Sequence, residues 1–150
     1  MAQPQRQYPE TVEMPRARTL RRIGVNPAYQ AYQILMIGFT ALPIVAGIDK
    51  FFDYLVNWQQ YLAPGISTRA PVSAEAFMMG VGVVEIVAGF VVAMKPRIGG
   101  WLVAAWLCAI VVNLLLIPGH FDVALRDLGL ALGAVALARL ARQFDPSIVN

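Results

Sequence analysis

The chain has few of the residues on which metal proteins and disulfide-stabilised proteins depend. Only 14% of its 150 residues are charged, and it contains one cysteine and one histidine. A single cysteine, Cys108, excludes a disulfide framework and a redox pair within the chain. His120 belongs to no Cys/His cluster with metal-site spacing, and one histidine cannot supply both axial ligands of a bis-histidine haem. We therefore expect no metal centre, and we interpret His120 as a surface-loop residue.

Motifs for nucleotide binding and ester hydrolysis are also missing. The sequence has no phosphate-binding glycine loop, no dinucleotide fingerprint and no G-x-S-x-G elbow. Its net charge of +3 is concentrated in arginines near the N-terminus, without the interleaved aromatic residues of an RNA-binding protein. We expect no nucleic-acid partner. Three methionines that could bind a metal are better explained by packing; they are Met78, Met79 and Met94.

Apolar residues are abundant instead, at 58% of the chain, and they form long blocks. The block from Ala76 to Met94 spans about 28 Å as a helix, which is close to the hydrocarbon thickness of a bilayer. Glu85 lies at its centre. A carboxylate at that depth costs several kcal/mol unless it is paired, protonated or facing a cavity. The sequence therefore predicts a membrane protein with a polar spot inside it.

Four such blocks predict an all-α fold, a four-helix transmembrane bundle at residues 29–150, preceded by an extended cytoplasmic arm at residues 1–28. Pro43 is expected to kink the first helix. The last helix begins near Asp122, a suitable N-cap, but its purely apolar part is short, so a helix lying in the membrane interface is the alternative. The expected spans are residues 31–55, 76–94, 98–117 and 122–141.

Basic residues predict the orientation of this bundle. Nine of the twelve Lys and Arg residues fall in the arm, in the turn between the second and third spans, and in the C-terminal tail. Both termini are therefore expected in the cytoplasm of a bacterial cell, with the bundle in its inner membrane. The arm of about 30 residues is too long for the n-region of a cleaved signal peptide. Aromatic residues mark the outer interface at Tyr54, Trp58 and Tyr61, and the inner one at Tyr29 and Tyr32.

Counting depth along the spans brings several polar residues to similar levels in the outer leaflet. One interpretation is a latch of ion pairs and hydrogen bonds that fixes the register of the helices. Glu85 is then expected to face the interior of the bundle, with Lys50 as its leading partner. The other is a site for a small molecule, a quinone or a proton, with Glu85 and Lys50 at its centre. We expect no catalytic residue under the first interpretation. The predicted network consists of Asp49, Lys50, Glu85, Asn113, Arg126 and Asp127.

Two other features suggest contacts between helices or subunits. Gly129 and Gly133 form a G-x-x-x-G face suited to close helix packing. The arm has three prolines from Pro4 to Pro15, which favour an extended path, and too little apolar surface to fold alone. It is therefore expected to bind a partner subunit or anionic headgroups. Its contact residues are predicted to be Tyr8, Met14, Arg16, Arg18, Arg21 and Arg22.

Several of these residues resemble the pattern of the DoxX/DoxD-like family of small four-helix membrane proteins. The resemblance rests on Gly47-x-x-Lys50, on the segment from Gly80 to Gly89 that includes Gly82 and Glu85, and on the Pro96-Arg97 turn. The segment DVALRDLGLALGAVALARL also resembles the last helix of the family. Membership would imply a four-helix membrane bundle and, for some members, a link to quinone-dependent sulfur oxidation or to redox complexes.

The sequence therefore predicts a non-enzymatic accessory subunit of a larger membrane assembly, an electron-transport complex by preference. Its partners would be other membrane subunits and lipids, without a cofactor of its own beyond a bound lipid or quinone. The alternative is an enzyme, the membrane subunit of a quinone-linked oxidoreductase of the thiosulfate:quinone type that uses Glu85 and Lys50. A small transporter is less well supported, because no inverted repeat is visible.

Overall fold

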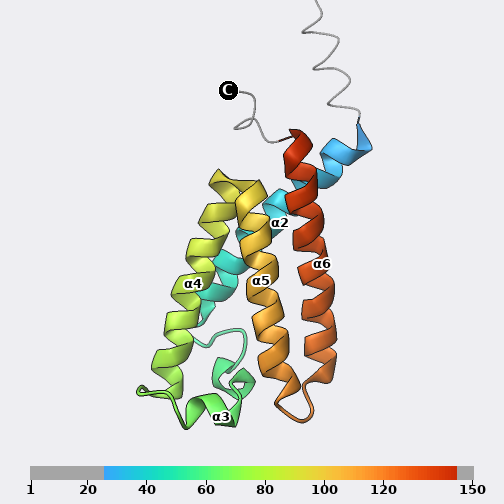
Figure 1. Cartoon of the computed structure of the whole chain (residues 1–150). Coiled ribbons are helices and arrows are strands. Elements are labelled where there is room, and N and C mark those ends of the chain that lie inside the picture. Colours follow the sequence, from blue (N-terminus) through green and yellow to red (C-terminus); the bar gives the residue numbers. More distant parts are fainter. Residues whose placement is uncertain (1–25, 145–150) are drawn as a thin grey trace, which may run out of the picture.

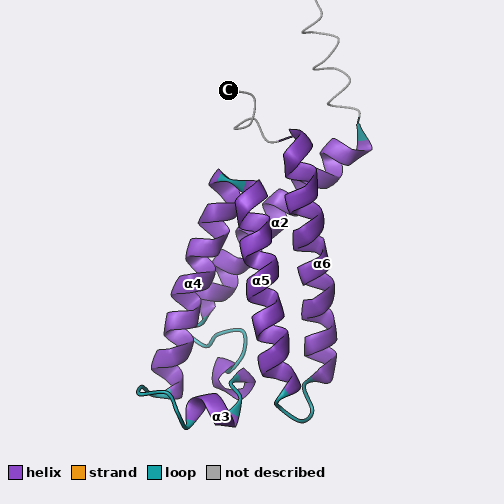
Figure 2. Cartoon of the chain, in the orientation of Figure 1, coloured by secondary structure: helices purple, strands orange, loops and turns teal. Residues whose placement is uncertain are grey.

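The computed structural model of the chain describes residues 26–144, and every regular element in that range is helical (Figures 1 and 2). The all-α class predicted from the sequence is therefore confirmed for this part of the chain. Most of the predicted arm lies outside the described residues. The long helices are α2 (Pro27–Asp49), α4 (Ala74–Met94), α5 (Pro96–Leu115) and α6 (Phe121–Phe144), and the short ones are η1 (Trp58–Tyr61) and α3 (Pro64–Ser67).

Three of these helices are long and apolar enough to cross a membrane, namely α2, α4 and α5. Their length and composition make the chain a multi-pass membrane protein with three candidate spans. The 24-residue helix α6 is as long as the others but carries charged residues near both of its ends. Its uncharged stretch, residues 128–138, covers only about 17 Å. A fourth span at α6 remains a prediction.

Local signals explain where these helices begin. The side chain of Asn26 accepts a hydrogen bond from the Ala28 amide at the start of α2, where Pro27 occupies the first turn. Ser73 accepts one from Ala76 at the start of α4. Pro96, which follows Lys95, cannot donate a backbone hydrogen bond, so α4 ends and α5 begins there. α2 continues through Pro43, which lies in the last third of the helix.

The four long helices form two closely packed pairs, α2 with α4 and α5 with α6 (Figure 1). Glycines make both pairings close. A Cβ atom added at Gly47 would lie 2.5 Å from the Gly82 carbonyl oxygen, so the backbones of α2 and α4 nearly touch there. A Cβ atom at Gly100 would lie 2.9 Å from Ala138 on α6. Small residues therefore replace bulky side chains at the contacts between helices, as is usual where water does not drive helix association.

The prediction that the first span reaches residue 55 was wrong, because α2 ends at Asp49. The chain then turns sharply at Asp53, the one described residue other than glycine with a positive φ, at 49°. Aspartate tolerates this conformation better than most residues. Since Lys50 meets Glu85, the twelfth residue of the 21-residue α4, α2 ends near the middle of the bundle. Residues 50–73 complete the remaining half as a loop containing η1 and α3 (Figure 1).

The bundle has two chemically distinct ends. The basic end holds the α4–α5 turn and the C-terminal end of α6, and the loop end holds η1, α3 and the α5–α6 turn (Figure 1). Near the basic end, the core contains Tyr32, Val92 and Leu137. Tyr32 was expected at the membrane interface, but it is buried and packs against the rings of Tyr29 and Phe144. At the loop end, a smaller cluster gathers around Ala63, Leu114, Ile117 and Ala124.

Candidate functional site

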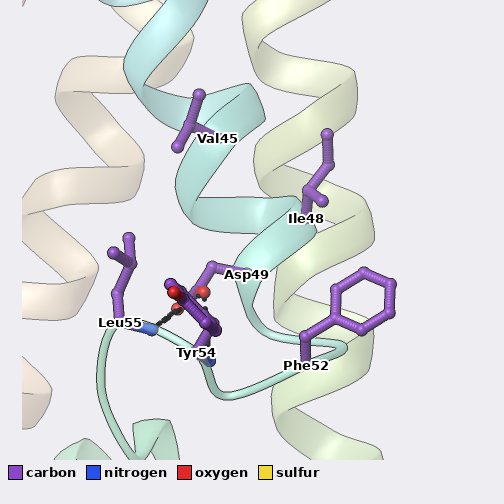
Figure 3. A pocket seen from close by; sticks show the side chains of 6 residues that line it. All are labelled: Val45, Ile48, Asp49, Phe52, Tyr54 and Leu55. Atoms are coloured by element: carbon purple, nitrogen blue, oxygen red, sulfur yellow. Dashed lines mark hydrogen bonds between the residues drawn. The ribbon is translucent and has the colours of Figure 1, made fainter.

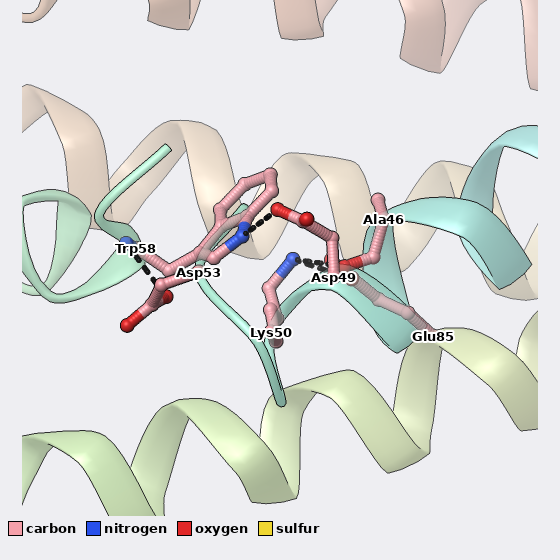
Figure 4. A network of polar contacts seen from close by, with 6 residues as sticks. All are labelled: Ala46, Asp49, Lys50, Asp53, Trp58 and Glu85. Carbon is pink, nitrogen blue, oxygen red and sulfur yellow. Dashed lines mark hydrogen bonds and ion pairs between the residues drawn. The ribbon is translucent and has the colours of Figure 1, made fainter. Parts of the chain in front are cut away.

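A buried ion pair joins α2 to α4 in the middle of the bundle. The Nζ atom of Lys50 lies 2.6 Å from Oε2 of Glu85, and both residues are buried (Figure 4). Glu85 was expected to face the interior with Lys50 as its leading partner, and the structure brings these two residues together. Two opposite charges taken out of water are costly to separate, because each would be left buried without compensation.

The register of α4 explains why Glu85 points inward. Five of its six buried residues follow alternating spacings of four and three, the pattern of a single helix face. Glu85 occupies one position on this face, between the two close glycine contacts of α4 with α2. The carboxylate is therefore placed by the same stripe that packs the helix. The stripe consists of Met78, Gly82, Glu85, Gly89 and Val92.

The ammonium of Lys50 is enclosed on its other sides. It donates a longer hydrogen bond, 3.5 Å, to the carbonyl oxygen of Ala46 within α2. It also lies 3.6 Å from the centroid of the Trp58 ring, which comes from η1. A cation over an indole face is attracted by the negative face of the ring, and the attraction is stronger where water is excluded. Glu85, Ala46 and Trp58 thus contact the Lys50 ammonium from three protein segments (Figure 4).

Asp49 joins this ion pair to the loop. Its carboxylate accepts hydrogen bonds from the backbone amides of Tyr54 and Leu55 and from Nε1 of Trp58, the last at 2.7 Å. Asp53 extends the arrangement, since it accepts from the side chain of Gln59 at 2.9 Å. Trp58 therefore serves both residues at the end of α2: its ring covers Lys50, and its N–H binds Asp49 (Figure 4).

The second helix pair contributes two further polar groups near Glu85. The indole Nε1 of Trp106 on α5 is buried near the Glu85 carboxylate, but the two groups do not form a hydrogen bond. Asp127 on α6 is partly buried and close enough to interact electrostatically with Glu85 and Lys50. Together with Asp49 and Trp58, these groups and the Lys50–Glu85 pair form the polar centre of the bundle. It is asymmetric, because a tight ion pair between α2 and α4 faces less closely paired groups from α5 and α6.

Asn113 and Arg126 do not join the Lys50–Glu85 pair. Asn113 instead holds the loop, because its Oδ1 accepts from the Ala63 amide at 3.0 Å and its Nδ2 donates to the Tyr61 carbonyl at 2.6 Å. The Arg126 side chain is 69% exposed and lies 3.8 Å from Asp127, a weak contact at the surface. The single predicted network is thus divided. Trp58 links the Lys50–Glu85 pair to Asp49, whereas the Asn113 contacts are separate, because a loop rather than a helix fills this half.

The predicted G-x-x-x-G face takes part in packing at only one of its glycines. Gly133 faces the Phe39 ring of α2, whereas Gly129 is exposed, and a Cβ atom added there would meet no atom of the described chain within 4 Å. His120, expected at the surface, is partly buried with its ring edge-on to Tyr61 at 5.3 Å. The predicted arm contacts lie outside the described residues; they are Tyr8, Met14, Arg16, Arg18, Arg21 and Arg22.

Sequence reasoning missed the roles of two tryptophans. Trp58 was interpreted as an interface marker, and nothing local shows that its loop folds back over Lys50. Trp106 carries a detectable signal, since it lies three residues after the buried Val103 and seven after the buried Gly99 on α5. This spacing places it on the inner face of the helix.

An open, apolar pocket of about 470 Å³ adjoins the polar centre at the end of α2 (Figure 3). Its walls are apolar and aromatic side chains, and Asp49 is its one charged lining residue. The carboxylate that borders the pocket is thus the same one that binds Trp58. The pocket is lined by Val45, Ile48, Asp49, Phe52, Tyr54 and Leu55.

Comparison of the chain with protein-family models, curated proteins and solved structures gives no match. The resemblance to the DoxX/DoxD-like family therefore stays a prediction that rests on the residues quoted for it.

Proposed function

We propose that the chain is a non-enzymatic accessory subunit that acts structurally in a larger bacterial membrane assembly, with a respiratory or photosynthetic electron-transport complex as the parent. The observation that carries this proposal is that the Lys50 ammonium contacts Glu85, Ala46 and Trp58, all from the same chain. Groups that satisfy one another hold helices in register, which is the task of a structural module. Its partners are other membrane subunits and lipids.

The outer surface of the bundle supports a location in the membrane. Large apolar side chains are exposed along α2, α4 and α5, including Leu42, Phe90 and Val112, each more than half exposed. Lipid or neighbouring apolar helices would cover them. The predicted arm adds a means of attachment, since its arginines and prolines suit binding across an acidic surface of a partner.

Purification of the tagged chain from native membranes in a mild detergent tests this proposal. Mass spectrometry should identify other membrane subunits in fixed stoichiometry with it. Deletion of residues 2–20 should leave the bundle folded and lower the recovery of those subunits. A matched control replaces the same residues with a Gly/Ser segment of equal length, which keeps the spacing and removes the contacts. Recovery of the full chain alone, free of partners, would refute the accessory role.

The distribution of charge supports an orientation with the basic end in the cytoplasm of the bacterial inner membrane. Lys95, Arg97, Arg139 and Arg142 lie at that end, whereas Arg69 lies at the other. In a Cys108→Ser background, the substitutions Thr68→Cys and Gln143→Cys each place one cysteine, the first at the loop end and the second at the basic end. A membrane-impermeant thiol reagent added to intact cells should label the first position and spare the second. The reverse pattern would overturn the orientation.

A second candidate function is the membrane subunit of a quinone-linked oxidoreductase. The apolar pocket favours it, because such a pocket can take an isoprenoid tail while the Asp49 carboxylate lies at its border (Figure 3). Solvent extraction of the purified chain followed by chromatography would reveal a bound quinone. One quinone per chain, lost in Val45→Trp and retained in the lipid-facing control Val112→Trp, would favour this candidate over the accessory role.

A further inference from the structure

The α4–α5 turn at the basic end carries two cationic side chains and is separate from the polar centre. Lys95 and Arg97 are both exposed there, on either side of Pro96. Lys95 is the N-cap of α5, yet no side chain caps the helix. The start of a helix carries a partial positive charge and attracts anions. Two cationic side chains thus flank an uncapped helix start.

The neighbouring helix brings more positive charge to the same end. Arg139 and Arg142 are exposed on α6, and the close contact of Gly100 with Ala138 places this part of α6 beside the first turns of α5. Figure 1 shows the α4–α5 turn and the end of α6 at one end of the bundle. Among residues 26–144, no acidic residue lies in 86–121 or 128–144, so the cations at this end are not neutralised by described carboxylates.

Apolar side chains continue directly from the turn along the membrane surface of the bundle. Met94, Ile98 and Trp101 are 69%, 58% and 50% exposed. Arg97 and Trp101 are four residues apart on α5 and therefore share one face. Tryptophan favours the level of lipid headgroups, where one side of the ring is apolar and its N–H is wet. The surface thus presents positive charge at the end of the helix and apolar side chains one turn below it.

We infer that this surface, formed by Lys95, Arg97 and Trp101 with Met94 and Ile98, binds an anionic phospholipid. The phosphate lies at the start of α5 between Lys95 and Arg97, and the acyl chains follow Met94, Ile98 and Trp101. A soluble phosphate would use only the charges and would leave the apolar half of the surface without a role. Arg139 and Arg142 add to the local potential that attracts the headgroup.

Native mass spectrometry of the full chain in detergent tests the inference, because lipid binding is then measured independently of membrane orientation. The probes are phosphatidylglycerol and phosphatidylcholine with identical acyl chains. We expect clear preference for phosphatidylglycerol. Each basic residue near an anionic surface contributes about 1 kcal/mol, or roughly fivefold. The double variant Lys95→Gln/Arg97→Gln should therefore bind phosphatidylglycerol roughly 10- to 30-fold more weakly and phosphatidylcholine unchanged.

Matched variants and a soluble competitor separate a lipid site from general attraction. Arg97→Gln should weaken phosphatidylglycerol binding several-fold, whereas Arg69→Gln, an exposed arginine at the loop end, should not. Glycerol 3-phosphate should compete poorly, because it lacks the acyl chains. Equal binding by the double variant and the parent, equal losses in Arg97→Gln and Arg69→Gln, or full competition by glycerol 3-phosphate would each overturn the inference.

Discussion

The two halves of the bundle, on either side of Glu85, are held together by different chemistry. Toward the basic end, four helices pack through aromatic, aliphatic and small residues such as Tyr32, Val92 and Leu137. Toward the loop end, α2 is missing and a loop takes its place, held by Asp49, Asn113 and Trp58. Helices satisfy their own backbone groups, whereas a loop at membrane depth must find partners for them in the surrounding protein.

This difference explains why the polar residues gather where they do. The backbone amides of Tyr54, Leu55 and Ala63 are hydrogen-bonded by side chains of Asp49 and Asn113. The Lys50–Glu85 pair then fixes the end of α2 to α4, immediately before the loop begins. The polar centre is thus the structural consequence of ending one helix in the middle of a membrane bundle. Substitutions in each half can test this contrast.

Removal of one member of the ion pair should have the largest effect. Glu85→Leu leaves the Lys50 ammonium buried without its counter-charge, which should lower the free energy of unfolding by about 3–5 kcal/mol. Titration with sodium dodecyl sulfate in mixed micelles, followed by circular dichroism, measures this change. The control Val84→Leu alters the adjacent, exposed position on α4 and should change the stability little. Equal effects of the two substitutions would contradict the account.

A cavity in the helical half should lower the free energy of unfolding somewhat less than the loss of the ion pair does. Leu137 is fully buried, and Leu137→Ala should lower the free energy of unfolding by about 2–5 kcal/mol, with a value near 3 kcal/mol expected. The matched control is Leu132→Ala, because Leu132 is on the same helix but 66% exposed to the surroundings. The same titration should show a small change for this control. A large loss in Leu132→Ala would mean that α6 packs differently from the structure.

Close contact between α2 and α4 gives a third test. A Cβ atom at Gly47 would lie 2.5 Å from the Gly82 carbonyl oxygen, so Gly47→Ala must push the helices apart, at a cost of about 1–3 kcal/mol. Gly80 has open space around it within α4, and Gly80→Ala should be neutral or slightly stabilising. A thermal unfolding scan of both variants in one detergent measures the difference. Equal transition temperatures would refute the close approach of the helices.

The smallest effect is expected at the hydrogen bonds that hold the loop. Asn113→Ala leaves the Ala63 amide and the Tyr61 carbonyl without these partners, which should cost about 1–2 kcal/mol. The loss should be local to the loop end. Amide hydrogen exchange should therefore quicken at residues 58–67 and stay unchanged around Val92. Arg69→Ala, which alters an exposed residue of the loop, serves as the control. Uniformly faster exchange throughout the chain would contradict a division into two halves.

Periodicity predicts much of the helical half and the position of Glu85. The buried stripe of α4 can be read from its spacing, and Asp127 lies on the face of α6 that also holds Ala124, Ala131 and Ala134. Glu85 itself is conspicuous, because one carboxylate interrupts a long apolar block. These features depend on contacts close in sequence or on helix geometry alone, so a single sequence contains them.

The loop half could not be predicted in the same way. The apolar block of α2 continues through Phe51, Phe52 and Leu55, so composition extends the helix past its true end at Asp49. The helix ends there because the Asp49 carboxylate captures backbone amides of the following turn. The return of Trp58 to Lys50 and the capture of Ala63 by Asn113, 50 residues away in sequence, require tertiary structure. The sequence thus placed Lys50 with Glu85 in one region, but it did not reveal the loop partners of Asp49 and Asn113.

A double-mutant cycle on Lys50→Met and Glu85→Leu tests the central claim most directly. Each single variant leaves one buried charge unpaired and should lose about 3–5 kcal/mol of unfolding free energy, whereas the double variant replaces both charges with apolar groups and should recover most of that loss. A coupling energy above about 2 kcal/mol, measured by detergent titration of all four proteins, is the result this account predicts. Strictly additive losses would show that Lys50 and Glu85 do not hold α2 to α4, and would contradict the account.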